Sequence, residues 1–542
     1  MLPALHEHDR EVRPARSPRR AGRTALGLVA ALVLVSAAAS AAVRPGHSPA
    51  AGGAGIAERS VLPFSHDDYQ AARARAQRES KLLIIETWAT WCHTCQSMRS
   101  FVFTNPLLKP MADRFIFVSL DTDRPVNAAF VRRFPIMVWP TMLVIDPGQS
   151  SRSGDERVLG RWTGAQTAPE LLGRLAKLTT RSEGVDRQLE QADAAAAEGR
   201  WEQATALYRE AAGVTVSERP RALLGLIQAF TQRGDYRGCV DLVSTSLPAT
   251  GNGAAATDFA TYAVSCLDKE EDADLRQKLR LRLKEHVRSL VDDDRAPLSV
   301  DDRSDGFGTL IELSDALGDR PAGDRYAEAR LRMLESAAAA ARTAADAATF
   351  DQHRLESYRR LHRYEPAEKM LLQTARALPG DCNAPYRLAK LYYLMGRLDE
   401  AAAMVADALG KAYGTRRALA LELQATIRHG QGQTREAVLS LTAAINVIES
   451  QPPRNEVKLQ QLRRQVAAYQ NALLTGTKQT GPTSALTPAV APAVVDTSVL
   501  LADPSALTRF EEHEVVLPVV VLTTSTLNRV MVVELALPAL LP

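Results

Sequence analysis

The chain has 542 residues, which is too long for one hydrophobic core and predicts about three domains. It is rich in alanine, with 5% aromatic and 24% charged residues, and this composition is typical of a largely helical protein. The formal net charge of +3 gives no electrostatic argument for a nucleic-acid or membrane-surface partner, and five cysteines are too few for a disulfide-rich scaffold.

The N-terminal segment resembles an export signal in its composition. Several arginines precede an apolar run over residues 25–39, and Ala39-Ser40-Ala41 has the form of a signal-peptidase site. Residues 1–42 are therefore expected to be a cleaved signal peptide or, since the stretch from Ala25 to Val43 is just long enough to span a bilayer, an N-terminal membrane anchor. Both alternatives predict an extracytoplasmic protein, periplasmic or held in the cell envelope. Residues 43–60, rich in Pro, Gly and Ala, predict a linker.

Residues 61–180 alternate between helical and strand patterns. Ser65 is expected to cap a helix over residues 69–78. Residues 81–88 form an apolar run bounded by charges, typical of a strand buried on both faces. The run leads directly into Cys92-His93-Thr94-Cys95, after which residues 96–103 read as helical. The first cysteine is therefore predicted at the N-terminus of a helix.

This position favours thiolate chemistry. Unpaired backbone N–H groups and the positive end of the helix dipole stabilise a thiolate at Cys92, which makes it a nucleophile near neutral pH. Two intervening residues place both sulfurs on the first helical turn, so Cys92 attacks and Cys95 resolves the mixed disulfide. A positive charge on His93 would favour the thiolate further; alternatively, His93 is only a surface residue of the turn.

The segment from Glu86 to Cys95 resembles the active-site strand and turn of the thioredoxin superfamily. Val138-Trp139-Pro140-Thr141, followed by an apolar run over residues 142–146, resembles its cis-proline loop and next strand. Two further motifs, at residues 103–106 and 118–121, resemble the branch that contains the periplasmic electron-transfer disulfide reductases.

The resemblance implies an α/β thioredoxin fold with Cys92 and Cys95 as catalytic residues. It implies that Glu86 is a buried acid that relays a proton to Cys95, and that substrate is bound by Trp91, His93, Trp139 and Pro140. Two alternatives stay open: Glu86 could pair with a cation such as Lys81, and Trp139 could serve packing alone.

The Cys-x-x-Cys pair has two other interpretations. A structural zinc site needs four ligands, and no second Cys or His pair occurs at the spacing of a zinc knuckle. A purely structural disulfide across so short a loop would add little stability. We therefore expect no metal and no cofactor other than the redox-active disulfide of Cys92 and Cys95.

Residues 186–474 carry repeated helical patterns. Gly199-Arg200-Trp201 and Gly234-Asp235-Tyr236 begin similar segments, and a clearer copy surrounds Gly396 with neighbours about 34–36 residues away. These repeats resemble the tetratricopeptide family, which implies an all-α superhelix with a concave face that binds a protein partner. The alternative is that the array only spaces or dimerises the redox domain.

Other features of this region are less regular. A polar, acidic loop is expected near residues 291–305 and an alanine-rich helix near residues 335–348. Cys239 and Cys266 are expected to be core residues, and Cys382 an exposed free thiol in a turn.

The C-terminal tail differs from both domains. Residues 475–492 predict a linker, and residues 493–542 begin with a pattern that resembles the start of PIN-type ribonuclease domains, in which an aspartate at the position of Asp496 helps to bind a metal. The other acidic ligands of that family have no counterpart here. We therefore expect a partial PIN-like fragment or a disordered tail, and no nuclease activity.

Together, these features predict an exported thiol-disulfide oxidoreductase of the protein-disulfide reductase type. It would form mixed disulfides with substrate proteins or small thiols and recruit a protein partner on its helical repeats, with no nucleic acid involved. The alternative is a redox-sensing scaffold or binding protein with little turnover. The sequence leaves the direction of electron flow open.

Overall fold

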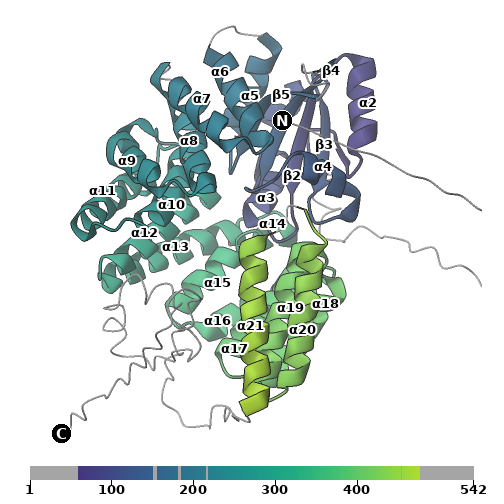
Figure 1. The fold of residues 1–542 in the computed structure, drawn as a ribbon, viewed down its shortest axis with the longest axis vertical. Coiled ribbons are helices and arrows are strands. Elements are labelled where there is room, and N and C mark those ends of the chain that lie inside the picture. The colour runs from purple at the N-terminus through teal and green to yellow at the C-terminus, as the bar shows by residue number, and fades with distance from the viewer. Residues whose placement is uncertain (1–58, 151–155, 181–184, 215–217, 453–454, 476–542) are drawn as a thin grey trace, which may run out of the picture. The chain divides into compact units, whose positions relative to one another are not determined.

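The computed structural model describes residues 59–150, 156–180, 185–214, 218–452 and 455–475. These residues form a sheet domain, elements β1 to α5, followed by a helical array, elements α6 to α21 (Figure 1). The predicted leader at 1–42, nearly all of the linker at 43–60 and the tail beyond residue 475 lie outside the described residues. Within the described ranges, no helix is both long enough and apolar enough to cross a bilayer.

The sheet domain is built on one mixed five-stranded sheet with the order β1-β3-β2-β4-β5. The first three strands of this order run parallel, β4 is antiparallel to β2, and β5 is antiparallel to β4. The strands are β1 (Phe64–His66), β2 (Leu83–Trp88), β3 (Ile116–Asp121), β4 (Thr141–Ser150) and β5 (Glu156–Thr163).

Both faces of the sheet are covered, as the apolar run at residues 81–88 predicts. In β2, Leu83 and Ile85 face one hydrophobic cluster, while Ile84 faces a second cluster on the opposite side. The side chains alternate because successive residues of a strand point to opposite faces. Burial on both faces leaves β2 at the centre of the sheet and holds the loop that follows it in place.

Helices and short helical turns surround this sheet. They are α2 (Tyr69–Glu79), α3 (His93–Ser97), the π-helix η1 (Met98–Val102), the 3₁₀ turns η2 (Pro106–Met111) and η3 (Pro125–Asn127), α4 (Ala128–Arg133) and α5 (Ala168–Thr180). The predicted cap at Ser65 is wrong: Ser65 lies in β1, and the N-cap of α2 is Asp68, whose carboxylate accepts from the backbone N–H of Ala71. Ser65 pairs with Val118 in the β1–β3 ladder, so it is extended and cannot cap the helix.

The helical array consists of successive helices that pack on their neighbours in chain order, as a tetratricopeptide-like superhelix requires. The helices are α6 (Val185–Ala197), α7 (Trp201–Val214), α8 (Arg219–Arg233), α9 (Tyr236–Ser246), α10 (Ala254–Leu267), α11 (Ala273–Asp292), α12 (Val300–Ala316), α13 (Arg320–Ala339), α14 (Ala344–Ala348), α15 (Asp351–Arg360), α16 (Tyr364–Ala377), α17 (Asn383–Leu394), α18 (Leu398–Lys411), α19 (Gly414–Gly430), α20 (Thr434–Glu449) and α21 (Glu456–Thr475), with the 3₁₀ turn η4 (Leu247–Ala249) after α9.

Two predictions for the middle of the array need correction. The acidic loop expected at residues 291–305 is shorter, because α11 continues to Asp292 and α12 starts at Val300. Ser299 and Asp302 form a capping box that starts α12, so the acidic residues lie in its first turn. The alanine-rich helix expected at 335–348 is interrupted, since α13 ends at Ala339 and Thr343 caps the separate helix α14.

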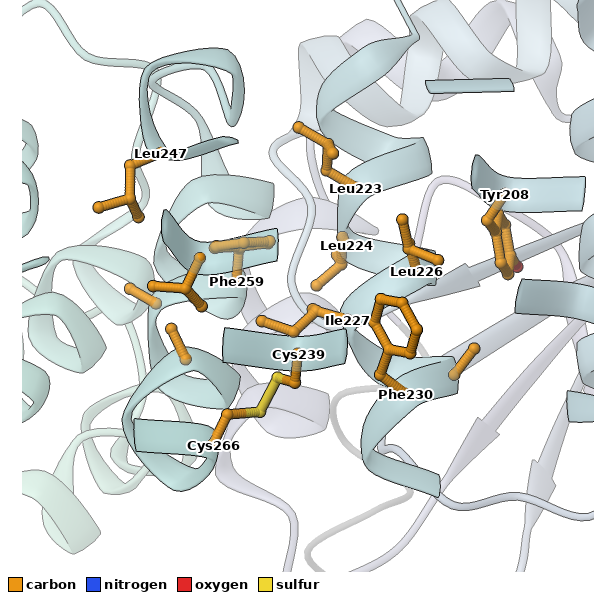
Figure 2. Packing of buried hydrophobic residues seen from close by; sticks show 14 of the residues in the cluster. Tyr208, Leu223, Leu224, Leu226, Ile227, Phe230, Cys239, Leu247, Phe259 and Cys266 are labelled. Carbon is orange, nitrogen blue, oxygen red and sulfur yellow. A yellow bond between two sulfur atoms is a disulfide. The ribbon is translucent and has the colours of Figure 1, made fainter. Parts of the chain in front are cut away.

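The cysteines of the array also differ from expectation. Cys239 of α9 and Cys266 of α10 lie in the core, as predicted, but they are joined by a disulfide (Figure 2). Cys382 is free, and it is buried at the N-cap of α17, not exposed in its turn. Burial raises the pKa of the Cys382 thiol to about 11, which makes it a poor nucleophile.

The array contacts the sheet domain well beyond its first helices. Arg59 pairs with Asp346 of α14, and Phe101 stacks on Phe350 with the ring centroids 5.5 Å apart. Further contacts join Thr90 to Asn383 of α17. Segments about three hundred residues apart in the chain therefore meet around the loop that follows β2.

Candidate functional site

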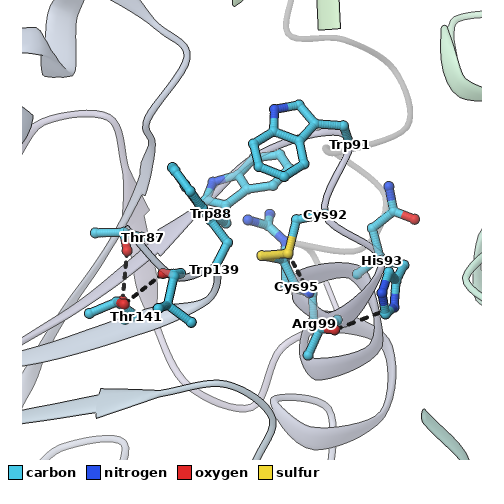
Figure 3. Close-up of a disulfide and its surroundings, with 12 residues drawn as sticks. Thr87, Trp88, Trp91, Cys92, His93, Cys95, Arg99, Trp139 and Thr141 are labelled. Carbon is cyan, nitrogen blue, oxygen red and sulfur yellow. Dashed lines mark hydrogen bonds between the residues drawn. A yellow bond between two sulfur atoms is a disulfide. The ribbon is translucent and has the colours of Figure 1, made fainter. Parts of the chain in front are cut away.

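The two cysteines of the Cys-x-x-Cys motif form a disulfide at the start of α3, with an S–S distance of 2.09 Å (Figure 3). Cys92 is the N-cap of the helix, and its sulfur accepts from the backbone N–H of Cys95 at 3.0 Å. Cys92 is 6% exposed and Cys95 is fully buried. The expected order therefore holds: Cys92 is the outer sulfur at a helix N-terminus, and Cys95 lies one turn deeper.

Aromatic rings surround the pair. Trp88, Trp91 and Trp139 pack against the cluster that contains both cysteines, and the Trp91 and Trp139 rings meet edge to face at 5.1 Å. The peptide bond between Trp139 and Pro140 is cis, and Pro140 is buried. The structure thus places two of the four predicted substrate-binding residues, Trp91 and Trp139, against the cysteine pair, and Pro140 directly follows Trp139.

Hydrogen bonds hold the cis-proline loop against the strand that carries the cysteines. The Thr87 hydroxyl donates to the carbonyl oxygen of Thr141, and the Thr141 hydroxyl donates to the carbonyl oxygen of Val138 (Figure 3). The Trp139 indole N–H donates to the Thr122 hydroxyl at 2.9 Å. The Trp139 side chain is therefore held by a hydrogen bond as well as by its packing against the cysteine pair.

Glu86 is buried beneath the active-site helix with 1% exposure, and its partner is Arg99, not Lys81. The two side chains approach to 3.6 Å, and Arg99 also donates to the Ser119 hydroxyl and lies over the Trp88 ring. Burial raises the pKa of Glu86, and Arg99 opposes that shift. One carboxylate oxygen of Glu86 has no hydrogen-bond partner within the described residues.

His93, the first residue of α3, is engaged by the helical array. Its Nδ1 lies 3.3 Å from a carboxylate oxygen of Asp301, and its Nε2 lies 3.2 Å from Nε2 of His353. Burial lowers the pKa of His93, but the charges of Asp301, Asp305 and Glu356 outweigh it and raise the pKa to about 9. His93 is therefore not simply a surface residue of the turn.

The array also holds the loops next to the disulfide. Asp123 accepts from the Trp91 indole N–H at 2.9 Å and from the backbone N–H of Thr415 at 3.0 Å. Asp121, two residues earlier, accepts from the Tyr413 hydroxyl. The Asp123 carboxylate therefore binds both the start of α19, at Thr415, and the Trp91 ring beside Cys92.

A cavity of 660 Å³ lies between the active-site loops and the array. The sheet domain contributes His93, Thr94, Val138, Trp139 and Gly164 to its wall, and α8, α10, α12, α13 and α15 contribute the rest. The wall of this cavity is therefore shared by the cis-proline loop and the helical repeats.

Local motifs do not indicate all of these residues. Arg99 lies four residues after Cys95, in the π-helix η1 that continues α3, so the sequence indicates that it lies near the cysteines but not that it pairs with Glu86. Asp301 and His353 have no such local signal, because their proximity to the disulfide depends on how the array packs, and Asp123 reaches Trp91 through the pairing of β3 with β2.

Comparisons with known proteins agree with this description. Residues 65–147 match the model of a thioredoxin-like family. Residues 493–524 match a PIN domain model, on a segment outside the described residues that includes Asp496. The thiol:disulfide interchange protein DsbD of Cronobacter sakazakii is 26% identical over 99 residues, which are 18% of this chain and 16% of that protein. The chain thus spans less than a fifth of the length of this relative.

Solved structures resemble each part separately. A thioredoxin from Thermus thermophilus is 24% identical and covers 22% of this chain and 88% of its own, with a TM-score of 0.20. A tetratricopeptide repeat protein from Parabacteroides merdae is 13% identical and covers 52% of this chain and 98% of its own, with a TM-score of 0.35. The strand order, the Cys-x-x-Cys turn and the paired helices carry the assignment: the chain contains a thioredoxin-like domain followed by a tetratricopeptide-like superhelix.

Proposed function

We propose that this protein is an exported thiol-disulfide oxidoreductase of the protein-disulfide reductase type. The observation that carries the proposal is the disulfide of Cys92 and Cys95 at the N-terminus of α3, beside the Trp139–Pro140 loop. A helix N-terminus stabilises the Cys92 thiolate once the pair is reduced, because its backbone N–H groups point at the sulfur.

The reaction transfers two electrons from the dithiol to a substrate disulfide. The Cys92 thiolate attacks one substrate sulfur, the substrate S–S bond breaks, and the other substrate sulfur leaves as a thiolate. Cys95 then loses its proton and attacks the Cys92 sulfur, which releases the second substrate thiolate and forms the Cys92–Cys95 disulfide. Reduction by a dithiol of a donor protein, through the same exchange in reverse, restores the starting state.

Glu86 is proposed to accept the proton of Cys95 during the second step. Its burial and raised pKa suit a proton acceptor, and its free carboxylate oxygen leaves room for a proton. Arg99 keeps the carboxylate paired between turnovers. A Glu86→Gln variant should slow the release of mixed disulfide more than its formation, as single-turnover kinetics would show.

The helical array is proposed to select the partner at the active site itself. The 660 Å³ cavity joins the cis-proline loop to the array, so a substrate protein would contact both at once. Substitutions on the array side of the cavity, such as Tyr262→Ala, should raise KM for a protein substrate and leave the rate with a small disulfide unchanged.

Export is supported by the second disulfide. Cys239 and Cys266 pair in the core of the array, and structural disulfides persist in oxidising compartments. The full chain fused to alkaline phosphatase at its C-terminus should give an active reporter, because that reporter needs the same compartment to form its own disulfides. A fusion that lacks residues 1–42 provides the control, and equal activity of the two fusions would argue against export.

Insulin reduction by the full chain tests the enzymatic step. The wild-type protein with excess dithiol should reduce insulin disulfides faster than a Cys92→Ser variant, and equal rates would rule out the enzyme proposal. A Cys95→Ser variant should accumulate mixed disulfides with its substrates, which identifies them. A reduction potential of about −270 mV would agree with a reductase, and one of about −120 mV with an oxidant.

The second candidate function is a redox-sensing scaffold with little turnover. It is favoured by the slight exposure of Cys92 and by the array contacts around Trp91. In that case the reduced and oxidised proteins should differ in partner binding, while insulin reduction stays at the rate of the Cys92→Ser variant.

A further inference from the structure

Three potential metal ligands from distant parts of the chain converge beside the disulfide. His93 is the first residue of α3, Asp305 lies on α12 and His353 lies on α15. One donor atom of each falls within 4.8 Å of the other two. The two Nε2 atoms are 3.2 Å apart, and Nε2 of His353 is 3.4 Å from a carboxylate oxygen of Asp305.

These separations match those of ligands that share one small ion. Nitrogen and oxygen ligands bind zinc at about 2.0–2.2 Å, so neighbouring donors in a tetrahedral site lie about 3.3–3.5 Å apart. The atoms would need little movement to accept an ion. Two imidazoles and one carboxylate are also a donor set that divalent transition metals prefer over magnesium or calcium.

The other ring nitrogen of each histidine has a polar partner that orients the ring. Nδ1 of His93 lies 3.3 Å from Asp301, and Nδ1 of His353 lies 2.8 Å from the Ser304 hydroxyl. Histidines that ligate metals almost always have such a partner. Asp301 is 1% exposed, and its second carboxylate oxygen has no hydrogen-bond partner within the described residues. This buried acid next to two imidazoles supplies negative charge that a cation would balance.

The site opens into the cavity beside Trp139. His93, Asp305 and His353 all line that cavity, and the side chains of His93 and Asp305 are 26% and 31% exposed. An ion could therefore enter from the cavity. Three protein ligands leave a fourth position, which here would face the space that a substrate enters.

We infer that His93, Asp305 and His353 bind one divalent transition-metal ion of the zinc class, with an open coordination position toward the cavity. The ion would join α3 of the thioredoxin-like domain to α12 and α15 of the array. This inference does not depend on the proposed reductase activity, because the three ligands are two imidazoles and a carboxylate, and neither cysteine sulfur takes part. It departs from the expectation of no metal site, which rested on ligand spacing along the sequence.

The competing interpretation is a direct hydrogen bond between the two imidazoles. At 3.2 Å, Nε2 of one ring can donate a proton to Nε2 of the other without any ion. In that case the cluster would be an ordinary contact between the two domains, and added metal would bind no better than to a variant without His353.

Zinc binding to the full chain separates the two interpretations. The protein is kept oxidised, so that the sulfurs of Cys92 and Cys95 cannot act as ligands, and it is dialysed against Zn²⁺ at neutral pH. We expect one zinc ion per chain, at least ten-fold weaker binding in His353→Gln and Asp305→Asn, and ten- to hundred-fold weaker binding in Asp301→Asn. The matched control is His286→Gln, which removes a partly buried histidine of α11 and should bind as the wild type does.

Cobalt(II) provides a second measurement that does not depend on stoichiometry. Bound in place of zinc, it should give the visible absorption of a tetrahedral site in the wild type and in Cys92→Ser/Cys95→Ser, and none in Asp305→Asn. Asp305→Asn preserves the side-chain shape, and circular dichroism checks that it folds. No zinc uptake by the wild type, or equal uptake by His353→Gln and Asp305→Asn, would overturn the inference.

Discussion

At the residue scale, the carboxylates of Glu86, Asp121 and Asp123 are buried near the disulfide. Asp121 is fully buried at the end of β3, where it accepts hydrogen bonds from Tyr413 and from the backbone N–H of Asp123. Burial raises the pKa of Asp121 to about 7, although the hydrogen bond from Tyr413 lowers it. The ionisation of this one side chain therefore affects the contact between the thioredoxin-like domain and α19.

This shift predicts how stability depends on pH. The folded protein holds the Asp121 proton more tightly than the unfolded chain, whose pKa is near 3.8, so the contribution of Asp121 falls as pH rises from about 4 to about 7. The slope is at most about 1.4 kcal/mol per pH unit. Urea unfolding of the wild type and Asp121→Asn between pH 4 and 8 should show the variant losing less stability. A stability difference that grows in favour of the wild type as pH rises would contradict this assignment.

Local motifs indicate the positions of individual site residues but not of their partners on the array. Cys92, Cys95 and Trp139 lie in local motifs, and the structure places them in one cluster. Their roles in catalysis and substrate binding stay predictions. Their neighbours on the array carry no local signal. The sequence indicated an acid at Glu86 but not its pairing with Arg99, because that contact joins a strand to a helix.

At the scale of elements, some helix pairs in the array pack closely because a small residue on one helix leaves space for a large side chain on the other. Gly225 of α8 faces the ring of Tyr208 on α7, and a Cβ atom built at Gly225 would lie 2.5 Å from a ring carbon. Tyr208 is buried, and its hydroxyl donates to Asp193 of α6. The ring therefore has little freedom to move away.

Gly225→Ala should destabilise the protein by about 1–3 kcal/mol, because it overpacks the contact between α7 and α8. The matched control is Gly213→Ala on α7, where a Cβ would meet nothing within 4 Å. Without a clash, alanine should stabilise that helix by up to about 1 kcal/mol. Thermal unfolding of the two variants should shift in opposite directions, and a Gly225→Ala variant as stable as Gly213→Ala would contradict the packing described.

The disulfide between α9 and α10 should contribute more stability than the one at the active site. It joins cysteines 27 residues apart, whereas Cys92 and Cys95 are separated by three. Closing the longer loop restricts the unfolded chain more, so Cys239→Ala/Cys266→Ala should cost about 3 kcal/mol in denaturant unfolding. Cys92→Ala/Cys95→Ala serves as the control and should cost clearly less. Equal losses in the two double variants would argue against this account.

Elements with a strong local pattern were predicted well. The strand at residues 81–88 and the helix at Cys92 were confirmed because an apolar run and a turn motif specify them locally. The predicted cap of α2 at Ser65 was wrong, because Ser65 pairs with Val118 in the β1–β3 ladder. The acidic stretch near residue 300 looked like a loop, but capping by Ser299 converts it into a first helical turn.

At the scale of the whole molecule, α19 meets the thioredoxin-like domain at a very close contact. Gly414 has a φ of 54°, and a Cβ there would lie 2.3 Å from the Cβ of Asp123. Asp123 also binds the Trp91 indole next to Cys92. A side chain at residue 414 would therefore push the array away from the active-site loop.

Gly414→Ala should loosen this contact and expose Cys92. The control Gly432→Ala also places alanine at a positive φ, of 79°, but meets nothing within 4 Å, so it isolates the backbone cost of about 1–2 kcal/mol. We expect faster alkylation of reduced Cys92 in Gly414→Ala than in Gly432→Ala, with faster amide exchange near Trp91. The same alkylation rate in both variants would mean that the contact does not cover the site.

The sequence by itself determined the local features: a Cys-x-x-Cys pair after a buried strand, a cis-proline loop and a run of paired helices. Strand burial, helix capping and motif spacing are short-range properties, so neighbouring residues specify them. Only the tertiary structure decided what surrounds the disulfide. Asp301 and His353 reach the active-site turn through the accumulated packing of many helices. The path of such an array depends on every helix contact along it, which no local pattern encodes.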